Sequence, residues 1–176
     1  MLKKISKKII TFIFIVFIYS ACEKNEGITT DTLPVQTGLF NSVVSHDGLS
    51  RQFIMYVPTN YNSDIEYPLM INFHGFGGTA SDFVETADMR SLAENENFII
   101  VYPQGTLLGG FPHWNSSAPS SDNKSSVDDI GFVEKMIENI SSTYSINEKR
   151  VYAAGYSNGG FLSYYLACNS KKFAAI

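Results

Sequence analysis

Three short, nearly continuous apolar runs are separated by stretches with helical periodicity, and this alternation constrains the fold more than any other feature of the sequence. The runs are Pro68–Phe73, Phe98–Tyr102 and Arg150–Ala154. Runs of this length are typical of strands that are covered on both faces of a sheet. Helices are predicted between them, at Ser81–Glu94 and at about Asp128–Tyr144. The pattern predicts an α/β fold with a mostly parallel sheet and helices on both faces.

The flanking segments extend this architecture. Phe40–Val44 and Arg51–Val57 lie on either side of His46-Asp47-Gly48, a turn signal that predicts a β-hairpin. After the third apolar run a helix is expected over Phe161–Ala167, and Phe173–Ile176 has the pattern of a fourth buried strand at its beginning. Ending within a buried strand would leave its partners uncovered. We therefore expect the 176 residues to be the N-terminal part of a larger domain.

The amino-acid composition excludes several classes of protein. The 176 residues carry a net charge of −4 and are 44% hydrophobic and 17% charged, which suits a folded domain. The acidic balance argues against nucleic-acid binding, which normally uses a basic face. Two cysteines exclude a disulfide-stapled scaffold and a multi-cysteine metal site. No metal-ligand constellation or phosphate-binding loop is visible, so no metal or cofactor is expected, and the oligomeric state is left open.

The first segment has the pattern of a secretory signal. Four lysines precede an apolar block, Ile9–Tyr19, and small residues precede Cys22. As a helix the block would be about 16 Å long, which is short for a hydrocarbon core of about 30 Å, although a buried helix or short anchor is the alternative. Tyr19-Ser20-Ala21-Cys22 resembles the bacterial lipobox, in which the cysteine is acylated and becomes the N-terminus.

These features predict three parts of the chain. Residues 1–21 are predicted to be a lipoprotein signal peptide, 22–38 a polar tether, and 39–176 the N-terminal part of the folded domain. Removing residues 1–21 removes four lysines and no acidic residue, so the net charge changes from −4 to −8. We expect an extracytoplasmic protein, either secreted or attached to the bacterial cell envelope through lipid on Cys22.

Gly155-Tyr156-Ser157-Asn158-Gly159 matches the G-x-S-x-G nucleophile elbow. It directly follows a predicted strand and precedes a predicted helix, the context that the motif requires. A serine in such a turn has a strained backbone and exposes its hydroxyl, and Gly155 and Gly159 leave room where a Cβ would clash. The alternative is an ordinary glycine-rich turn. Ser157 is the candidate nucleophile.

His74-Gly75-Phe76-Gly77-Gly78 follows an earlier strand, where a second oxyanion donor is expected. The backbone amides of Phe76 and Asn158 are the candidate donors, because Gly75 and Gly77 let the loop approach a substrate carbonyl and the helix N-terminus carries positive potential. His74 is expected to hold the loop in place rather than to act as the catalytic base. The alternative is that the glycines only form a turn.

Four segments together carry a family resemblance. They are Asn72–Gly75 with its glycines, Val101-Tyr-Pro-Gln-Gly105, Val127-Asp-Asp-Ile-Gly-Phe132, and Arg150–Gly160. From about residue 50 onward the chain resembles the secreted α/β-hydrolase esterases known as polyhydroxybutyrate depolymerase-like and feruloyl esterase-like proteins. The resemblance implies an α/β-hydrolase fold and hydrolysis of carboxylic esters through an acyl-enzyme. The substrates it implies are aromatic or acetyl esters on plant polysaccharides, or polyesters.

Two positions depart from the family pattern. Tyr156 stands where many members have leucine. Phe76 stands where some members have a cysteine, so Cys168 has no obvious disulfide partner and is expected to be a free, buried thiol.

The general base and its acid are missing from the expected place. In this fold the nucleophile is followed along the chain by an acid and then a histidine, but no Asp, Glu or His follows Ser157. His46, His74 and His113 all precede it, and using His113 as the base would require an unusual topology. Ser81 is predicted to cap the first helix, and Asp128 and Asp129 the second. We therefore expect the 176 residues alone to be inactive.

Two other functions remain open at this point. A prolyl-oligopeptidase-type serine peptidase shares a similar elbow, although the Tyr102–Gly105 and Asp128–Phe132 segments favour an esterase. A lipoprotein that binds glycans on an inactive hydrolase scaffold also fits the missing acid and histidine. Within the long loop that is expected to run to about Ser126, the aromatic segment 106–117 with Trp114 fits either ligand binding or loop packing.

Overall fold

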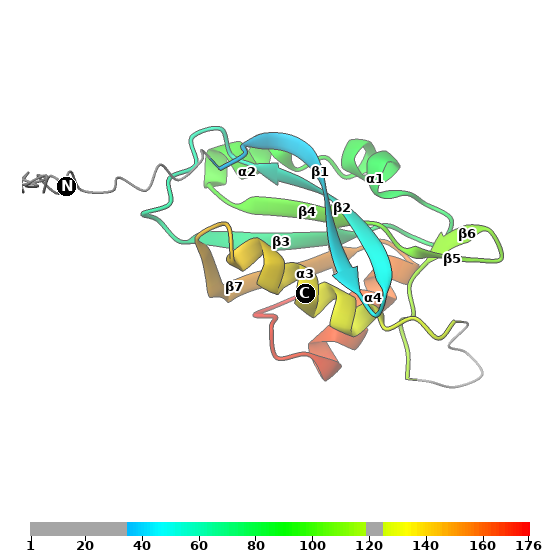
Figure 1. Ribbon diagram of the computed structural model, residues 1–176. Helices are drawn as coiled ribbons and strands as arrows, with labels where there is room; N and C mark the ends of the chain where they lie inside the picture. Colours follow the sequence, from blue (N-terminus) through cyan, green and yellow to red (C-terminus); the bar gives the residue numbers. More distant parts are fainter. Residues whose placement is uncertain (1–34, 119–124) are drawn as a thin grey trace, which may run out of the picture. The chain divides into compact units, whose positions relative to one another are not determined.

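Five strands form one mixed sheet in the order β1-β2-β4-β3-β7 (Figure 1). The computed structural model describes residues 35–118 and 125–176, which belong to a compact unit that runs from Pro34 to Ile176. The predicted signal peptide 1–21, Cys22 and most of the predicted tether 22–38 lie outside the described residues. The strands are β1 (Gly38–His46), β2 (Leu49–Val57), β3 (Tyr67–Phe73), β4 (Ile99–Pro103) and β7 (Ile146–Gly155).

The predicted hairpin and the predicted parallel strands are both present. β1 and β2 pair antiparallel, and the turn between them places Asp47 and Gly48 at positive φ, as a tight two-residue hairpin turn requires. β2 joins β4 in antiparallel fashion. The three apolar runs lie in β3, β4 and β7, where β3 pairs parallel with both neighbours. The β1–β2 hairpin thus extends the three parallel strands at one edge of the sheet.

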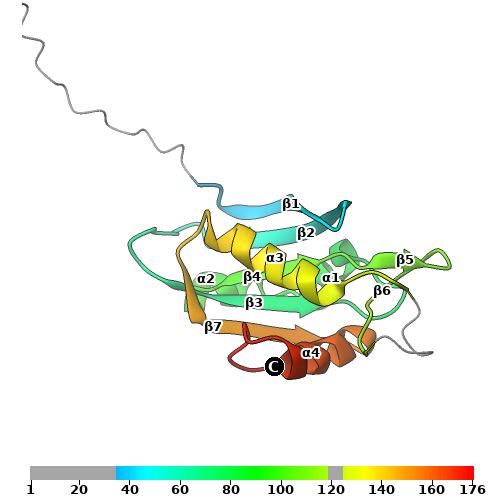
Figure 2. The ribbon, with the colours of Figure 1, turned by 60° about the horizontal axis from the view of Figure 1, so that its bottom comes forward.

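Helices cover both faces of the sheet, as predicted. α3 (Asp129–Ser141) and α4 (Asn158–Asn169) pack on one face, where the largest cluster of buried apolar side chains lies. α1 (Ala80–Thr86) and α2 (Arg90–Glu96) pack on the other face, over Ile100 and Tyr102 of β4. Figure 2 shows α3 in front of the sheet and α1 and α2 behind it. The buried face of α3 repeats at helical spacing (Phe132, Val133, Met136, Ile137 and Ile140).

The prediction of a single helix over Ser81–Glu94 is wrong, because the segment forms two short helices. The hydroxyl of Tyr102 donates to the carbonyl of Ala87 and accepts from the amide of Met89, at 2.8 and 3.2 Å. A buried tyrosine from β4 therefore satisfies the backbone groups that the break exposes. The N-cap is Thr79 instead of Ser81, since the Thr79 hydroxyl accepts from the amide of Asp82.

The long loop after β4 contains a short hairpin that was not predicted. β5 (Thr106–Leu108) and β6 (Phe111–His113) pair antiparallel, joined by Gly109 and Gly110, both at positive φ. Three-residue strands are too short to show periodicity, but the Gly-Gly pair was a usable turn signal.

The C-terminal segment differs from its prediction in three ways. The expected strand Phe173–Ile176 is represented by a single parallel bridge between Tyr152 and Ala175. The thiol of Cys168, expected to be buried, is exposed and free. α4 is longer than predicted and begins directly after Ser157. Across the described ranges 35–118 and 125–176, no helix is long and apolar enough to span a membrane.

Candidate active site

Ser157 lies in the sharp turn between β7 and α4, with φ +50° and ψ −116°. A non-glycine residue in this region is strained, and such strain persists only where the surrounding structure enforces it. The side chain is exposed, and its hydroxyl does not cap the helix that follows. The strand–serine–helix geometry predicted for the elbow is therefore present, and the hydroxyl is available for chemistry.

The two glycines of the motif allow the close contacts that build this turn. A Cβ on Gly155 would overlap the carbonyl carbon of Gly159 and lie 2.8 Å from the nitrogen of Gly160. A Cβ on Gly159 would overlap the carbonyl oxygen of Phe73 and lie 2.7 Å from its carbonyl carbon. The amide of Tyr156 also donates to the Phe73 carbonyl at 3.1 Å. α4 can start this close to the end of β3 only because no side chain intervenes.

The loop after β3 lies directly beside Ser157. A Cβ built on Gly75 would lie 3.5 Å from the Cβ of Ser157. Within this loop the amides of Gly77 and Gly78 donate to the carbonyls of Pro112 and Gly75, at 2.8 and 3.1 Å. Gly77 has φ +77°, a conformation that favours glycine.

Two amides on the segments next to Ser157 form no hydrogen bond within the described part of the chain. Among the residues that the structure describes, neither the amide of Phe76 nor that of Asn158 donates to a protein acceptor. Asn158 is the first residue of α4, so its amide belongs to the unpaired N-terminal turn of the helix. These are the two candidate donors that the sequence singled out, one on the loop after β3 and one at the start of α4.

The side chain of Asn158 fixes the aromatic loop to the elbow. Its amide oxygen accepts from the Trp114 amide at 2.7 Å, and its nitrogen donates to the Trp114 carbonyl at 3.0 Å. The indole nitrogen of Trp114 donates to the His74 carbonyl at 2.9 Å, and the ring packs edge-on against Phe73. Trp114 is only 2% exposed. Loop packing is thus the role that the structure shows for it.

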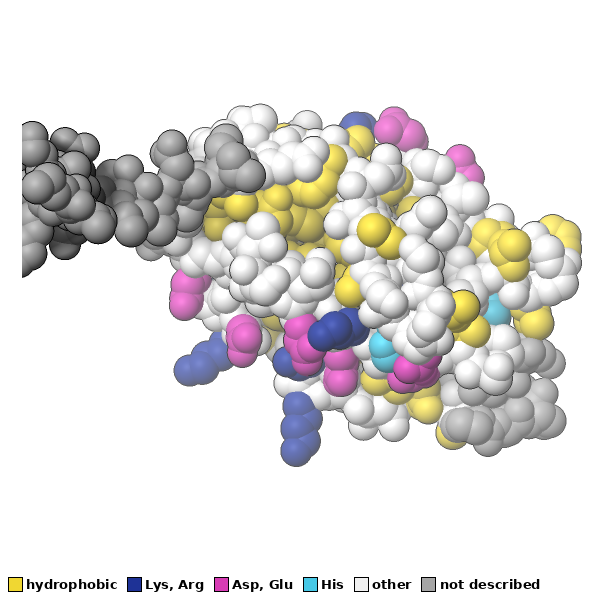
Figure 3. Space-filling view, in the orientation of Figure 1, with side chains coloured by type: hydrophobic (Ala, Val, Ile, Leu, Met, Phe, Trp, Pro, Cys, Tyr) yellow, Lys and Arg dark blue, Asp and Glu magenta, His cyan; other side chains and the backbone are white. Residues whose placement is uncertain are grey.

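Ser157 borders a cavity of about 370 Å³ whose wall combines apolar side chains with the polar residues Asn115, Ser116 and Asn158. Its wall includes Phe76, Leu108, Trp114, Phe161 and the buried His113. The rings of Phe76 and Phe111 lie side by side, with centroids 5.8 Å apart. Figure 3 shows hydrophobic side chains at the surface near the β5–β6 hairpin. A second cavity, of about 610 Å³, lies between the elbow and α1 and shares Phe76 with the first.

His74 has the structural role expected for it. Its Nε2 accepts from the Gly105 amide at 3.0 Å, and its Nδ1 lies 2.7 Å from the Gly75 carbonyl and donates to it. The ring joins the loops that follow β3 and β4, and both nitrogens are occupied. Burial lowers the pKa of His74 below its ordinary value of 6.5, which keeps the ring neutral.

This shift makes stability depend on pH. Because the folded state lowers the pKa of His74, the unfolded chain binds a proton more readily, and the free energy of unfolding falls as the pH drops below about 6.5. One such group contributes a slope of at most about 1.4 kcal/mol per pH unit. Urea denaturation from about pH 7 to about pH 5 should show a smaller slope for His74→Gln than for the wild type. Equal slopes would contradict this assignment.

The other two histidines are also engaged. His113 Nδ1 lies 3.1 Å from the Thr106 carbonyl and Nε2 lies 3.2 Å from the side-chain oxygen of Asn115. His46 pairs with Asp128. In the described segments no histidine is hydrogen-bonded to Ser157.

Asp128 and Asp129, the two acidic residues at the start of α3, have different roles. Asp128 is the N-cap and accepts from the Gly131 amide at 2.9 Å, as predicted. Asp129, also predicted to cap, is instead buried and pairs with Arg51 of β2 at 2.6 Å. Its second oxygen accepts from the Asn115 amide at 2.8 Å. The sequence did not reveal this pair because its members are 78 positions apart.

Comparisons with known proteins identify the family of the chain. The Esterase family model matches residues 47–174. Feruloyl esterase B from Piromyces equi is 31% identical over 67% of this chain and 21% of that protein. The bifunctional acetylxylan esterase/xylanase XynS20E from Neocallimastix patriciarum is 27% identical over 71% of this chain and 17% of that protein.

A solved structure shows the same fold. The acetyl xylan esterase from Aspergillus awamori superposes with a TM-score of 0.63 and 21% identity, over 77% of this chain and 50% of that one. The chain thus spans half or less of the length of these relatives. With an α/β-hydrolase fold and a family match over most of its described length, the chain belongs to the Esterase family.

Proposed function

We propose that the chain carries the nucleophile and the oxyanion hole of a serine carboxylic-ester hydrolase. One observation carries the proposal: Ser157 is exposed at φ +50°, next to a loop and a helix start whose Phe76 and Asn158 amides donate to no acceptor among the described residues. Such an arrangement suits acyl transfer, in which negative charge develops on a carbonyl oxygen.

The proposed acylation proceeds by attack of the Ser157 oxygen on the ester carbonyl carbon. The carbonyl electron pair moves onto oxygen, and the amides of Phe76 and Asn158 stabilise the resulting charge; loss of one such donor costs about 10²- to 10³-fold in rate. The serine proton passes to a base and then to the leaving alcohol, which departs and leaves an acyl-enzyme. Water then releases the acid and restores the serine.

The base in this scheme is a histidine other than the three in the chain. His74 and His113 have both ring nitrogens engaged, and His46 pairs with Asp128 at the β1–β2 turn. The family order places the acid and the base after the nucleophile, and no Asp, Glu or His follows Ser157 here. We therefore expect residues 1–176 alone to hydrolyse p-nitrophenyl acetate no faster than background.

The proposed substrates are aromatic or acetyl esters on plant polysaccharides, or polyesters. Support comes from relatives named feruloyl esterase and acetylxylan esterase, and from the aromatic residues Phe76, Trp114 and Phe161 in the wall of the cavity beside Ser157. The test assays the longest protein that the reading frame encodes against methyl ferulate, p-nitrophenyl acetate and a dipeptide anilide. Turnover of both esters with none of the anilide is expected. Cleavage of the anilide alone would indicate a peptidase instead.

We also propose that the mature protein is extracytoplasmic and attached to the membrane through lipid on Cys22. The support is the signal pattern of residues 1–21 and the lipobox-like Tyr19–Cys22. Cys22→Ala, or treatment of producing cells with globomycin, should cause uncleaved or unlipidated precursor to accumulate, which immunoblotting of membrane fractions detects. Unchanged processing would overturn the lipid anchor.

A further inference from the structure

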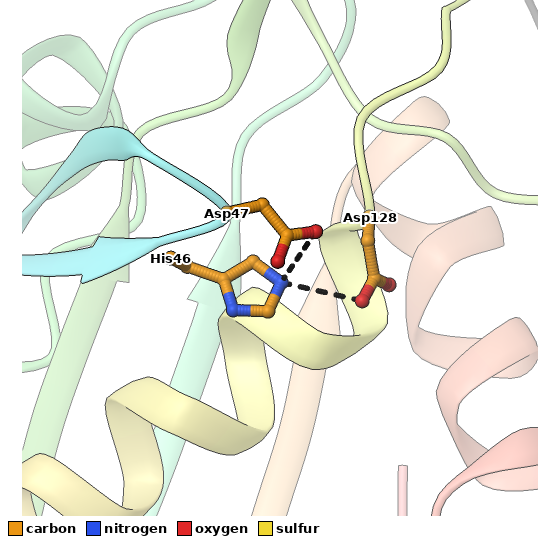
Figure 4. A group of neighbouring side chains, drawn as sticks. All are labelled: His46, Asp47 and Asp128. Atoms are coloured by element: carbon orange, nitrogen blue, oxygen red, sulfur yellow. Dashed lines mark hydrogen bonds and ion pairs between the residues drawn. The ribbon is translucent and has the colours of Figure 1, made fainter.

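We propose that His46, Asp47 and Asp128 form a binding site for a divalent transition-metal ion such as Zn²⁺. The three side chains come from the β1–β2 turn and from the start of α3, and they point toward one another (Figure 4). One ligand atom from each lies within 4.8 Å of the other two. An imidazole nitrogen with two carboxylate oxygens is a donor set that suits Zn²⁺ and its neighbours.

The two separations that involve His46 match the edges of a tetrahedral coordination sphere. His46 Nε2 lies 3.2 Å from Asp128 Oδ2 and 3.6 Å from Asp47 Oδ2. Ligands bound to zinc at about 2.0–2.2 Å in tetrahedral geometry stand about 3.3–3.6 Å apart. An ion therefore fits with small side-chain movements. The exposed carboxylates leave room for water at the fourth position.

The charges around the cluster favour a cation. Two carboxylates converge on one nitrogen, Nε2 of His46, which carries at most one proton. Within residues 35–118 and 125–176, no lysine or arginine forms an ion pair with Asp47 or Asp128. The start of α3 contributes a partial charge of roughly +0.5, which two carboxylates outweigh. A divalent ion would balance this local charge.

Packing holds the His46 ring in place, and the helix cap holds the Asp128 carboxylate. The His46 side chain is 17% exposed, so its ring is held by its surroundings. Asp128 uses Oδ1 to cap α3 through the Gly131 amide, which leaves Oδ2 for an ion. Gly131 is also required sterically, because a Cβ there would overlap Asp128 Oδ2 and lie 2.8 Å from His46 Nε2. The ion would join the β1–β2 turn to the N-terminus of α3, residues that are 82 positions apart.

Isothermal titration with ZnCl₂ tests the site without reference to enzymatic activity. Both cysteines are replaced by serine in every protein used, because the exposed thiol of Cys168 is itself a zinc ligand. We expect one zinc per chain, weaker binding of MnCl₂, and little binding of CaCl₂, which prefers all-oxygen sites. At about a hundredfold excess over the dissociation constant, zinc should raise Tm by about 5–10 °C.

Variants then assign the binding to the cluster. His46→Gln and Asp128→Asn should each weaken zinc binding by at least about tenfold, since loss of supporting groups alone has effects of that size. Asp128→Asn keeps the oxygen that caps α3. Asp64→Asn changes an exposed acid elsewhere and should bind zinc like the parent. Absence of zinc binding at millimolar concentration, or unchanged affinity in His46→Gln, would overturn the proposal.

Discussion

Ser157→Ala is expected to lower kcat for ester hydrolysis by about 10⁴- to 10⁶-fold, the range seen when the nucleophile of a serine hydrolase is removed. The reason is that, in the proposed mechanism, the exposed hydroxyl of Ser157 forms the acyl bond. The amides of Phe76 and Asn158 remain in the variant, so some rate above the uncatalysed reaction should persist.

The measurement uses the longest protein that the reading frame encodes, with Ser91→Ala as the matched control. Ser91 is exposed on α2, away from the elbow, and its replacement should leave kcat unchanged. Labelling with a fluorophosphonate, followed by mass spectrometry, should place the adduct on Ser157. Full activity in Ser157→Ala would refute the serine mechanism, whatever the substrate.

Asp129→Ala should lower the free energy of unfolding by about 3–5 kcal/mol, because it leaves the charge of Arg51 buried and uncompensated. Arg51 is 3% exposed and Asp129 2%, and their ion pair spans 2.6 Å. The guanidinium also lies over the ring of Phe132, 3.8 Å from its centroid. A loss of this size is a large part of the stability of a typical domain.

Urea denaturation of three variants separates the charge effect from the packing effect. Asp64→Ala removes an exposed acid and should change stability by less than about 0.5 kcal/mol. The double variant Arg51→Met/Asp129→Leu removes both charges and should be markedly more stable than Asp129→Ala, as found for apolar replacements of buried pairs. If the double variant is as unstable as the single one, the loss comes from packing instead of the unpaired charge.

The ion pair also connects to the candidate site. Asp129 accepts from the amide of Asn115, and the adjacent Trp114 pairs with the side chain of Asn158. The side chain of Asn115 in turn donates to the Val127 carbonyl at 2.6 Å, which holds the aromatic loop against the start of α3. Replacing Asp129 therefore removes a hydrogen bond that holds the loop lining the cavity beside Ser157.

Short sequence patterns predicted correctly those turns whose geometry depends on residues adjacent in the sequence. The β1–β2 turn follows from Asp47 and Gly48 at positive φ, and the elbow follows from a strand, a serine and two glycines in one short segment. The break between α1 and α2 was missed because it depends on a hydroxyl from Tyr102, which lies on another element. The exposed Cys168 was missed because the sequence does not show which side of α4 is covered.

The sequence alone predicted the α/β architecture and the strand–turn–helix geometry around Ser157, the candidate nucleophile, because strand periodicity and glycine conformation act over a few residues. It also supplied the two amides that are proposed to flank this serine. The tertiary structure decided three other matters: the packing role of Trp114, the pairing of Arg51 with Asp129, and the meeting of His46 with Asp128. Those partners lie 40 to 82 positions apart. Contacts at such separations depend on how the sheet and helices pack, and no pattern along the chain encodes them.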